Sequence, residues 1–556
     1  MNKMKLKDNL KIFLLAPDLV NRSGYCYTNW FQVLEKLSSE LILFDYRDYL
    51  ESNYCLEKLN NLILEKVLDS KPDIIFYPVH RNELSMETFI KIKEVLPCTK
   101  IFTYISDDDW RHENHSRFLA LYSDYFTICF PPNIPKYEKY GHKNIILTQW
   151  ASNPINFYPT EAEKKIDVSL IGLAYKPRPE WIKYLLDNGI KVKVFGKGWS
   201  KYPEFRTING GFLSGEKYLT TINQTKINLN FGWNSDDGAL QVKGRTFEFG
   251  ASKAFQITNF NPILNNYFTE DHDIVYFRNK EDLLGKVKYY LEKEEERNRI
   301  AQNCYENVIR NHTWEKRFID IFKQTELKKS QFNFNKNKNY KVDIIMLGRK
   351  KDFNEKTIRS INDQLNITKK NLIYFDENNL IDKFKYDFVT FCSPDEIWNL
   401  NKLEFQMYAM ECDKNTINLT DFQINEGSCL YKRWIMIRKI VRSEKGKYFP
   451  YLLPLSTIMM KKELFIKELP NFNNLINNKE LTFYENILKE RYNHIELPLI
   501  EFSKFRFNKK KGEIKRFIYM NSDLRRRRFF KECLRKGKIF KSISLLIEMI
   551  EREYFF

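Results

Sequence analysis

The sequence lacks the features that mark several common classes of protein. Its nine cysteines are odd in number and form no Cys-x-x-Cys pair or zinc-ligand spacing, which predicts reduced thiols in a cytosolic compartment. It has no run of about 18 apolar residues, so no transmembrane helix is expected. The short apolar run from Ile12 to Pro17 predicts a first strand, not a signal peptide. Zinc-finger, RNA-recognition and helix-turn-helix patterns are also missing, and we expect no nucleic-acid partner.

The composition is neither acidic nor poor in apolar residues. Apolar residues make up 43% and charged residues 29% of the 556 residues, which suits a globular protein with room for three domains. Lys plus Arg exceed Asp plus Glu by 91 − 72 = 19. Sixteen Lys/Arg against three acidic residues fall between Lys504 and Lys541. A basic protein attracts nucleic acid, anionic lipid or an acidic substrate.

Strand-like apolar runs alternate with helical stretches along most of the chain, which predicts an α/β protein with parallel sheets. The alternation restarts near residue 160, so two doubly wound lobes are expected with a ligand cleft at their carboxyl edges. An Asn- and Lys-rich stretch then predicts a linker. The expected order is a first lobe, a second lobe, the linker, a further α/β domain and a basic helical tail: 1–160, 161–327, 328–340, 341–505 and 506–556.

Five ordered pieces of the second lobe resemble the CgeB-like branch of the group 1 glycosyltransferases. They are IDVSLIGLAYKPRPEWIKYL, KVFGKGW, GEKYLTTINQTKINLNF, KGRTFEFGASKAFQITNF and EERNRIAQNCYENVIRNHTWEKR. The resemblance implies a GT-B fold of two Rossmann-like lobes. It also implies transfer of a sugar from a nucleotide-diphosphate donor, retention of anomeric configuration, and no cofactor for this half of the chain.

The same pieces predict the donor site, because a diphosphate is bound by cations and by backbone N–H groups at helix starts. Lys243 and Arg245 precede or begin one expected helix, and the resemblance gives Glu248 the role of holding the ribose. These three residues are the predicted catalytic set. The predicted donor-binding residues are Gly172, Lys176, Arg178, Gly196, Gly198 and Trp199.

Each of these residues also has a purely structural interpretation. Arg245 and Glu248 would make a surface i,i+3 ion pair of little value. Lys176 and Arg178 would be solvated turn residues, and the two glycines of Gly-Lys-Gly-Trp would only allow a tight turn. Trp199 would pack in the core instead of against a nucleobase.

In the first lobe, NRSGYCYTNWFQVL and YISDDDW resemble the family's glycine-bearing loop and acidic stretch. Gly24, Asp107 and Asp108 are therefore predicted on the acceptor side. The triplet ending in Asp109 would alternatively cap the following helix or hold a metal. His312, in the His-Thr-Trp ending of the second lobe, is expected to be structural.

The region from Lys341 resembles family-2 glycosyltransferases of the GT-A fold, but with eroded motifs. Ser393 stands where the first Asp of the metal-binding Asp-x-Asp is expected, so a degenerate domain is predicted, with retained catalysis as the alternative. A second candidate site comprises Asp376, Asp395, Glu396 and Glu480. Mg²⁺ or Mn²⁺ would bind weakly around Asp395, since the serine lacks the missing charge.

Arg525–Arg528 and the two phenylalanines after them leave three interpretations of the tail: anionic lipid binding, an acidic partner, or a solvated face. The expected enzyme is a cytoplasmic glycosyltransferase, which the tail would place at the inner membrane surface. Its acceptor would be a surface protein of the spore or flagellar type, or an envelope glycan. The alternatives are a bifunctional transferase with two active modules and a non-catalytic carbohydrate-binding or surface-assembly protein.

Overall fold

The structure is a computed structural model that describes residues 10–17, 19, 24–47, 49, 56–80, 83–233, 239–375, 380–394, 396–425, 432–435, 455–476, 482–487, 490 and 492–502. The chain divides into two compact units. The first comprises Met1–Ser52, Lys58–His112 and Leu119–Asn333, and the second Asn53–Glu57, Glu113–Phe118 and Phe334–Phe556. The predicted basic tail, 506–556, lies outside the described residues.

The first lobe is built on a six-stranded sheet in the order β2-β1-β3-β4-β5-β6, in which every pair of neighbours is parallel. All five residues of β3 are buried, as expected for a parallel sheet covered on both faces. The strands are β1 Lys11–Ala16, β2 Glu40–Asp45, β3 Ile74–Pro78, β4 Lys100–Ile105, β5 Tyr125–Ile128 and β6 Ile145–Leu147. The helices are η1 Tyr27–Phe31, α1 Gln32–Leu37, α3 Leu56–Ser70, α4 Met86–Val95, α5 Asp108–Arg111, η2 His112–Ser116, α6 Arg117–Leu121, η3 Pro131–Asn133 and α7 Ile134–Lys139.

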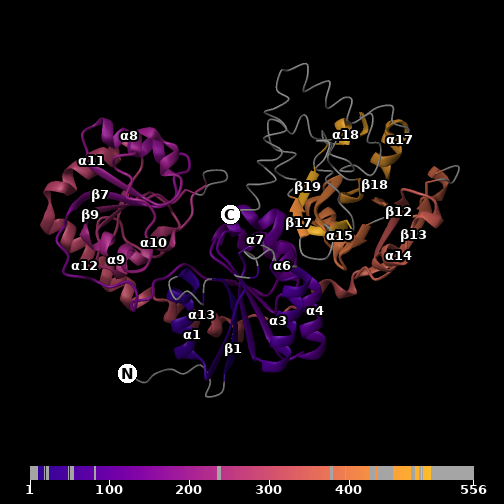
Figure 1. Cartoon of the computed structure of the whole chain (residues 1–556), viewed down its shortest axis with the longest axis horizontal. Helices are drawn as coiled ribbons and strands as arrows, with labels where there is room; N and C mark the ends of the chain where they lie inside the picture. The colour runs from indigo at the N-terminus through magenta and orange to yellow at the C-terminus, as the bar shows by residue number, and fades with distance from the viewer. Residues whose placement is uncertain are drawn as a thin grey trace, which may run out of the picture. The chain divides into compact units, whose positions relative to one another are not determined.

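The second lobe repeats this architecture with a five-stranded parallel sheet in the order β11-β10-β9-β7-β8. Figure 1 shows α8 and α11 on one side of this sheet and α9, α10 and α12 on the other. The strands are β7 Ile166–Ile171, β8 Val192–Phe195, β9 Thr225–Asn230, β10 Gln256–Asn259 and β11 Val275–Phe277. The helices are α8 Arg178–Asp187, η4 Trp199–Lys201, η5 Pro203–Phe205, α9 Gly215–Gln224, α10 Gly244–Ala251, η6 Leu264–Asn266, α11 Lys280–Glu292, α12 Glu294–Asn311 and α13 Trp314–Leu327.

The chain passes between the two lobes twice, and the two crossings pair with each other. Ser152 donates its backbone N–H to the His312 carbonyl (3.1 Å) and accepts from the Trp314 N–H (3.0 Å). After this crossing α13 returns to the first lobe, where Trp314 and Phe318 are fully buried in the core beside β1. The predicted α/β fold of two Rossmann-like lobes is confirmed.

The second unit contains a mixed sheet in the order β13-β12-β14-β18-β16-β19-β15, with β17 paired to β16. Strand β18 runs antiparallel to both β14 and β16. The strands are β12 Tyr340–Met346, β13 Ile367–Tyr374, β14 Phe388–Cys392, β15 Glu396–Trp398, β16 Ile417–Asn425, β17 Lys432–Ile435, β18 Ile458–Lys461 and β19 Tyr492–Phe502. The helices are η7 Phe334–Asn337, η8 Lys350–Asp352, α14 Glu355–Asn362, η9 Leu380–Lys383, α15 Lys402–Asp413, η12 Leu455–Thr457, α17 Lys462–Ile476 and α18 Thr482–Ile487. A GT-A relationship for this unit stays a prediction.

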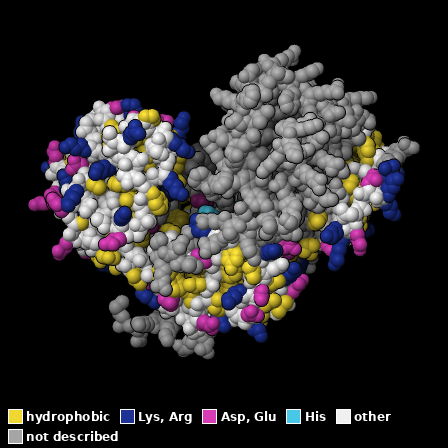
Figure 2. All heavy atoms as spheres, in the orientation of Figure 1, with side chains coloured by type: hydrophobic (Ala, Val, Ile, Leu, Met, Phe, Trp, Pro, Cys, Tyr) yellow, Lys and Arg dark blue, Asp and Glu magenta, His cyan; other side chains and the backbone are white. Residues whose placement is uncertain are grey.

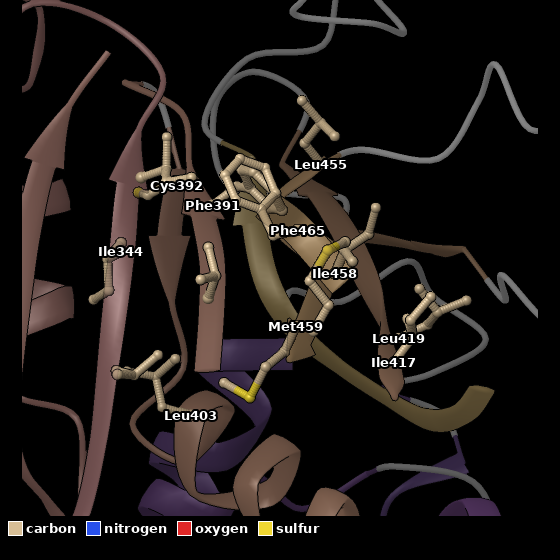
Figure 3. Packing of buried hydrophobic residues seen from close by; sticks show 14 of the residues in the cluster. Ile344, Phe391, Cys392, Leu403, Ile417, Leu419, Leu455, Ile458, Met459 and Phe465 are labelled. Carbon is tan, nitrogen blue, oxygen red and sulfur yellow. The ribbon is translucent and has the colours of Figure 1, made fainter. Parts of the chain in front are cut away.

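The core of the second unit packs on both faces of this sheet. Phe391 of β14 contacts Phe465 of α17 with ring centroids 5.6 Å apart, and Figure 3 shows these two rings together. On the other face, Leu403 of α15 and Met459 of β18 are buried near β12. The region named as a degenerate domain therefore has a complete apolar core.

Candidate functional site

The carboxyl edge of the second-lobe sheet is built around Gly172, the residue after β7. Its N–H donates to the Phe195 carbonyl (2.7 Å), which brings the ends of β7 and β8 together. A Cβ at Gly172 would lie against the Arg245 guanidinium and 2.9 Å from Arg178 Nη1. Gly196 has φ +125°, and a Cβ there would lie 2.5 Å from the Gly172 carbonyl oxygen. Both predicted glycines are therefore required by close approach.

Arg178 begins α8 and is 2% exposed. Its guanidinium donates to the carbonyls of Leu173 (3.1 Å) and Phe231 (2.8 Å) and stacks on the Tyr175 ring, 4.0 Å from the centroid. Burial and then the neighbouring Arg245 lower its pKa to about 9. Arg178 is thus not the solvated turn residue of the structural interpretation.

Arg245, the second residue of α10, points back to the same glycine. Its Nη1 donates to the Ile171 carbonyl (2.6 Å), and its Nε is buried without a partner. Among the described residues, neither Arg245 nor Arg178 forms an ion pair with a carboxylate. Two guanidinium groups with unpaired charge therefore meet at one sheet edge, where an anion would bind.

Lys243 is the N-cap residue of α10 and makes no side-chain cap. Its ammonium donates to Gln241 Oε1, and Gln241 Nε2 donates to Asp109 Oδ1 (2.6 Å). Burial, followed by Arg178 and Arg245, lowers the pKa of Lys243 to about 8. A third cation thus joins the cluster, at the start of a helix where backbone N–H groups also favour anions.

Glu248 lies one turn further along α10 and is 5% exposed. Its Oε2 accepts a hydrogen bond from the Tyr218 hydroxyl (2.6 Å). Burial raises the pKa of this carboxyl, against the opposing effects of Tyr218 and Arg245. The structure therefore holds Glu248 in the interior and not in a surface ion pair.

The remaining donor-site predictions divide between structural and exposed positions. Trp199 is fully buried against Phe205, and its indole N–H donates to the Gly172 carbonyl (2.8 Å). Among the predicted donor-binding residues, Trp199 therefore fits the core-packing interpretation and not the base contact, and it fixes the turn that carries Gly172. Gly198 has φ +89°, in the left-handed region that favours glycine. Lys176 is exposed.

On the first lobe, the structure separates the two predicted aspartates. Asp108 is fully buried, with Oδ1 accepting from the Tyr137 hydroxyl (2.8 Å) and Oδ2 from Asn133 Nδ2 (3.0 Å). This corrects the acceptor-side prediction for Asp108, which fastens α5 to α7. Asp107 is partly exposed, makes no cap hydrogen bond and is near enough to Lys243 to favour its charged form. Gly24 begins the first helix, its carbonyl accepting from the Thr28 N–H (3.0 Å).

Of the second candidate site, Asp376, Asp395 and Glu480 lie outside the described residues. Glu396 is 1% exposed, with one oxygen accepting from the Ser393 N–H (3.0 Å) and the other from the Ser456 hydroxyl (2.5 Å). Both Glu396 oxygens therefore accept hydrogen bonds from within the protein, and this carboxylate does not fit the role of a metal ligand. In the part of the chain that the structure describes, no group of three or more His, Cys, Asp or Glu is placed to hold a metal ion.

His312 is structural in the fold, as expected. Its two ring nitrogens contact Arg317 Nη2 (3.0 Å) and the Tyr267 carbonyl (3.2 Å). Burial and then Arg317 lower the pKa of His312 to about 4, so the ring is neutral near pH 7.

Sequence reasoning missed Gln241, Tyr218 and Tyr25. Gln241 joins Lys243 to Asp109, Tyr218 holds Glu248, and Tyr25 lies next to α10. Tyr218 and Tyr25 both fall within stretches that carry the family resemblance, but no spacing rule distinguishes them from core aromatics. Only the folded positions connect them to the site.

Comparison with known proteins agrees with the geometry of the second lobe. Residues 178–323 match a family described as "Glycosyl transferase-like". The spore protein CgeB of Bacillus subtilis (strain 168) is 22% identical over 246 residues, which cover 41% of this chain and 74% of that protein. The second lobe is thus similar to glycosyltransferases. The prediction of a glycosyltransferase enzyme is confirmed, whereas a fused family-2 domain stays a prediction.

Solved structures similar to this chain include two that align over almost their whole length with about 57% of it. One is a glycosyltransferase from Rickettsia africae ESF-5, with a TM-score of 0.39, 11% identity, and coverage of 57% of this chain and 99% of that one. Another is Anabaena Alr3699/HepE in complex with UDP and glucose, with a TM-score of 0.41, 9% identity, and coverage of 57% and 98%. Within the described part of the glycosyltransferase, no helix is both long and apolar enough to cross a membrane.

Proposed function

We propose that the first unit transfers a sugar from a nucleotide-diphosphate sugar to an acceptor hydroxyl. The observation that carries this proposal is the convergence of the Arg178 and Arg245 guanidinium groups on Gly172, where both donate only to backbone carbonyls. Shielded charges that have only neutral hydrogen-bond partners are costly, so this arrangement favours a bound anion. A diphosphate offers several oxygens for two forked donors.

The other side chains at this edge suit the remaining parts of such a donor. Lys243 adds a third cation at the start of α10. Glu248, whose ionised form only accepts hydrogen bonds, suits the hydroxyl groups of the ribose or sugar. Lys176, being exposed, would make at most a peripheral phosphate contact.

In the proposed reaction the acceptor oxygen forms a bond to the anomeric carbon, and the bond from that carbon to the diphosphate oxygen breaks. The electron pair leaves on the diphosphate, and the acceptor proton passes to a phosphate oxygen or to water. Negative charge therefore grows beside Arg245 and Lys243, where preorganised cations lower the barrier. Retention of configuration is carried over from the family resemblance.

The same cations support transfer without a metal cofactor in this unit, because they carry the charge that a divalent ion would supply. On the acceptor side, Asp107 is the remaining candidate for contacting the incoming hydroxyl. The similarity to a spore protein favours an acceptor of the spore-surface or envelope type. The second unit would present that acceptor, and the basic tail would attract an anionic surface or partner.

The experiment is a thermal-shift screen of nucleotide sugars with the full chain, followed by assays of donor hydrolysis. A bound donor raises the unfolding temperature by ligand linkage. Arg245→Ala should lose the shift, whereas Arg278→Ala should keep it, since Arg278 is an exposed arginine paired with Glu270. The proposal fails if no nucleotide sugar shifts the wild-type protein and none is hydrolysed.

A further inference from the structure

Tyr25 holds a fixed position at the edge of the first-lobe core. It follows Gly24 in the first turn of the helix that leads to η1. Its ring makes edge-on contacts with Trp30 (5.3 Å, 82°) and Trp150 (5.4 Å, 88°). Aromatic neighbours on two sides restrict the ring, so the hydroxyl points in one direction.

That hydroxyl lies beside the start of α10 in the second lobe. A Cβ built on Gly244, the first residue of α10, would lie 3.7 Å from Tyr25 Oη and 3.4 Å from Trp150 Cε3. Glycine leaves open the small space between the phenol and the helix start. Tyr25 is therefore a first-lobe residue that reaches the cation cluster of the second lobe.

The hydroxyl proton of Tyr25 has no acceptor among the described residues. The indole N–H groups of Trp30 and Trp314, in the same aromatic cluster, are donors only and cannot accept it. Burial and then the charge of Glu248 raise the pKa of Tyr25 well above its ordinary value. The phenol is thus a neutral donor whose proton has no acceptor among the described residues, which is costly for a buried hydroxyl.

The start of α10 supplies the matching environment for a ligand oxygen. Its N-cap, Lys243, makes no side-chain cap, so the first backbone N–H groups have no side-chain acceptor from that position. Arg245, in the first turn, has a buried Nε without a partner. Three kinds of unused donor, from the helix start, Arg245 and Tyr25, therefore occur around Gly244.

We infer that the Tyr25 hydroxyl donates a hydrogen bond to a phosphate oxygen of the donor bound at the start of α10. This inference rests on the proposed function and adds a donor contact from the first lobe. The diphosphate site then has all its hydrogen-bond donors only when the Tyr25 hydroxyl lies beside Gly244. Loss of the hydroxyl is then a loss of ligand binding and not of folding.

The test compares Tyr25→Phe with Tyr276→Phe in the full chain. Tyr276 is the matched control, because its hydroxyl is also buried without a partner but lies on β11. Calorimetry with free nucleoside diphosphates should give about 10–150-fold weaker binding for Tyr25→Phe, the size expected for one hydrogen bond to a charged group. Tyr276→Phe should bind as the wild type does, and neither variant should have a lower ligand-free unfolding temperature than the wild type.

Each outcome separates this inference from the function on which it rests. If the wild type binds no nucleoside diphosphate or nucleotide sugar, the proposed function fails. If Arg245→Ala loses diphosphate binding while Tyr25→Phe keeps it, the function stands and the Tyr25 contact is wrong. If Tyr25→Phe weakens only the nucleotide sugar and not the diphosphate, the hydroxyl contacts the sugar, and the phosphate assignment is overturned.

Discussion

Two lysines, half-buried Lys243 in the first unit and fully buried Lys402 in the second, have similar electrostatic properties but different surroundings. Burial is the main cause that lowers the pKa of Lys243 to about 8 and that of Lys402 to about 7. Lys243 lies beside two arginines with no carboxylate ion pair among the described residues. Lys402 is fully buried, donates to Gln406 Oε1 (2.8 Å) and lies 3.9 Å above the Trp398 ring centroid.

The different surroundings of Lys243 and Lys402 show that a shifted pKa does not identify a ligand site by itself. The second unit surrounds its lysine with an amide, an aromatic face and the charge of Glu396, whose own oxygens are both hydrogen-bonded. The first unit gathers like charges and leaves them open to an anion. The lack of carboxylate ion pairs around these cations, among the described residues, distinguishes the candidate donor site more than burial does. Figure 2 shows that acidic and basic side chains are mixed over the described surface that is visible in this view.

The largest effect is expected for Arg245→Ala, which tests whether the cations at Gly172 form the donor site. Transfer should fall by about 10²–10³, as is typical when one preorganised stabiliser of a developing negative charge is removed. The measurement is kcat/KM with the best donor. Arg278→Ala, at an exposed ion pair on the same lobe, should change it by less than twofold. Near-normal turnover of a folded Arg245→Ala protein would remove this residue from the site.

The next largest effect is expected for Glu248→Ala. Loss of a charged acceptor should weaken nucleotide-sugar affinity by roughly 1.5–3 kcal/mol, or about 10–150-fold. Calorimetry measures this, with Tyr218→Phe as the comparison because it removes only the group that holds Glu248. Equal affinity in wild type and Glu248→Ala would show that the carboxylate is structural.

Much of the fold was predictable because strand runs and helical stretches are local properties of the sequence. The run 166–185 and the Lys243–Phe260 block both marked real ends of strands and starts of helices. Convergence of Arg178 and Arg245 on Gly172 was not predictable from spacing, since it depends on how β7 and α10 pack. Core packing, one of the two interpretations that the sequence left open for Trp199, agrees with its complete burial.

The aspartate triplet shows the same limit more sharply. Asp107 and Asp108 are adjacent and chemically identical, yet one is partly exposed near Lys243 and the other is fully buried in contact with Tyr137. The sequence placed both at the end of a strand, correctly. Which one lies near Lys243 depends on the local path of α5, and no spacing rule contains that information.

Lys402→Met tests the lysine of the second unit. We expect this change to alter the pH dependence of stability and to have little effect on sugar transfer. The pKa of Lys402 in the fold, about 7, lies below the ordinary 10.5, so between these values the unfolded chain binds a proton that the folded chain lacks. Stability should therefore rise as the pH increases from about 7 to 10.5, with a slope of at most about 1.4 kcal/mol per pH unit.

Denaturant unfolding at pH 7.5 and 9.5 measures this slope. Lys402→Met keeps the side-chain volume, and removing a buried charge in this way is often neutral or stabilising. The slope of the variant should be smaller than that of the wild type, because the contribution of Lys402 is lost while the lowered pKa of Lys243 still contributes. Lys338→Met, at an exposed lysine, should keep the wild-type slope. Identical slopes for wild type and Lys402→Met would mean that the buried ammonium does not titrate in this range. Donor turnover should change by less than twofold.

The smallest expected effect is that of metal removal on transfer by the full chain. Arg178, Arg245 and Lys243 already place cations where the leaving diphosphate would develop charge, and the Glu396 oxygens are occupied by internal donors. EDTA should therefore leave the transfer rate within about twofold. Ionic strength must be held constant, because screening alone alters the binding of charged ligands over about 8–10 Å.

The control experiment compares the transfer rates of the wild type and of Glu396→Gln after EDTA treatment and again after addition of Mn²⁺. A loss in EDTA that Mn²⁺ restores in the wild type but not in Glu396→Gln would move the chemistry to the second unit. The same loss and recovery in both proteins would place a metal outside Glu396, and the cation cluster at Gly172 would then be insufficient for catalysis.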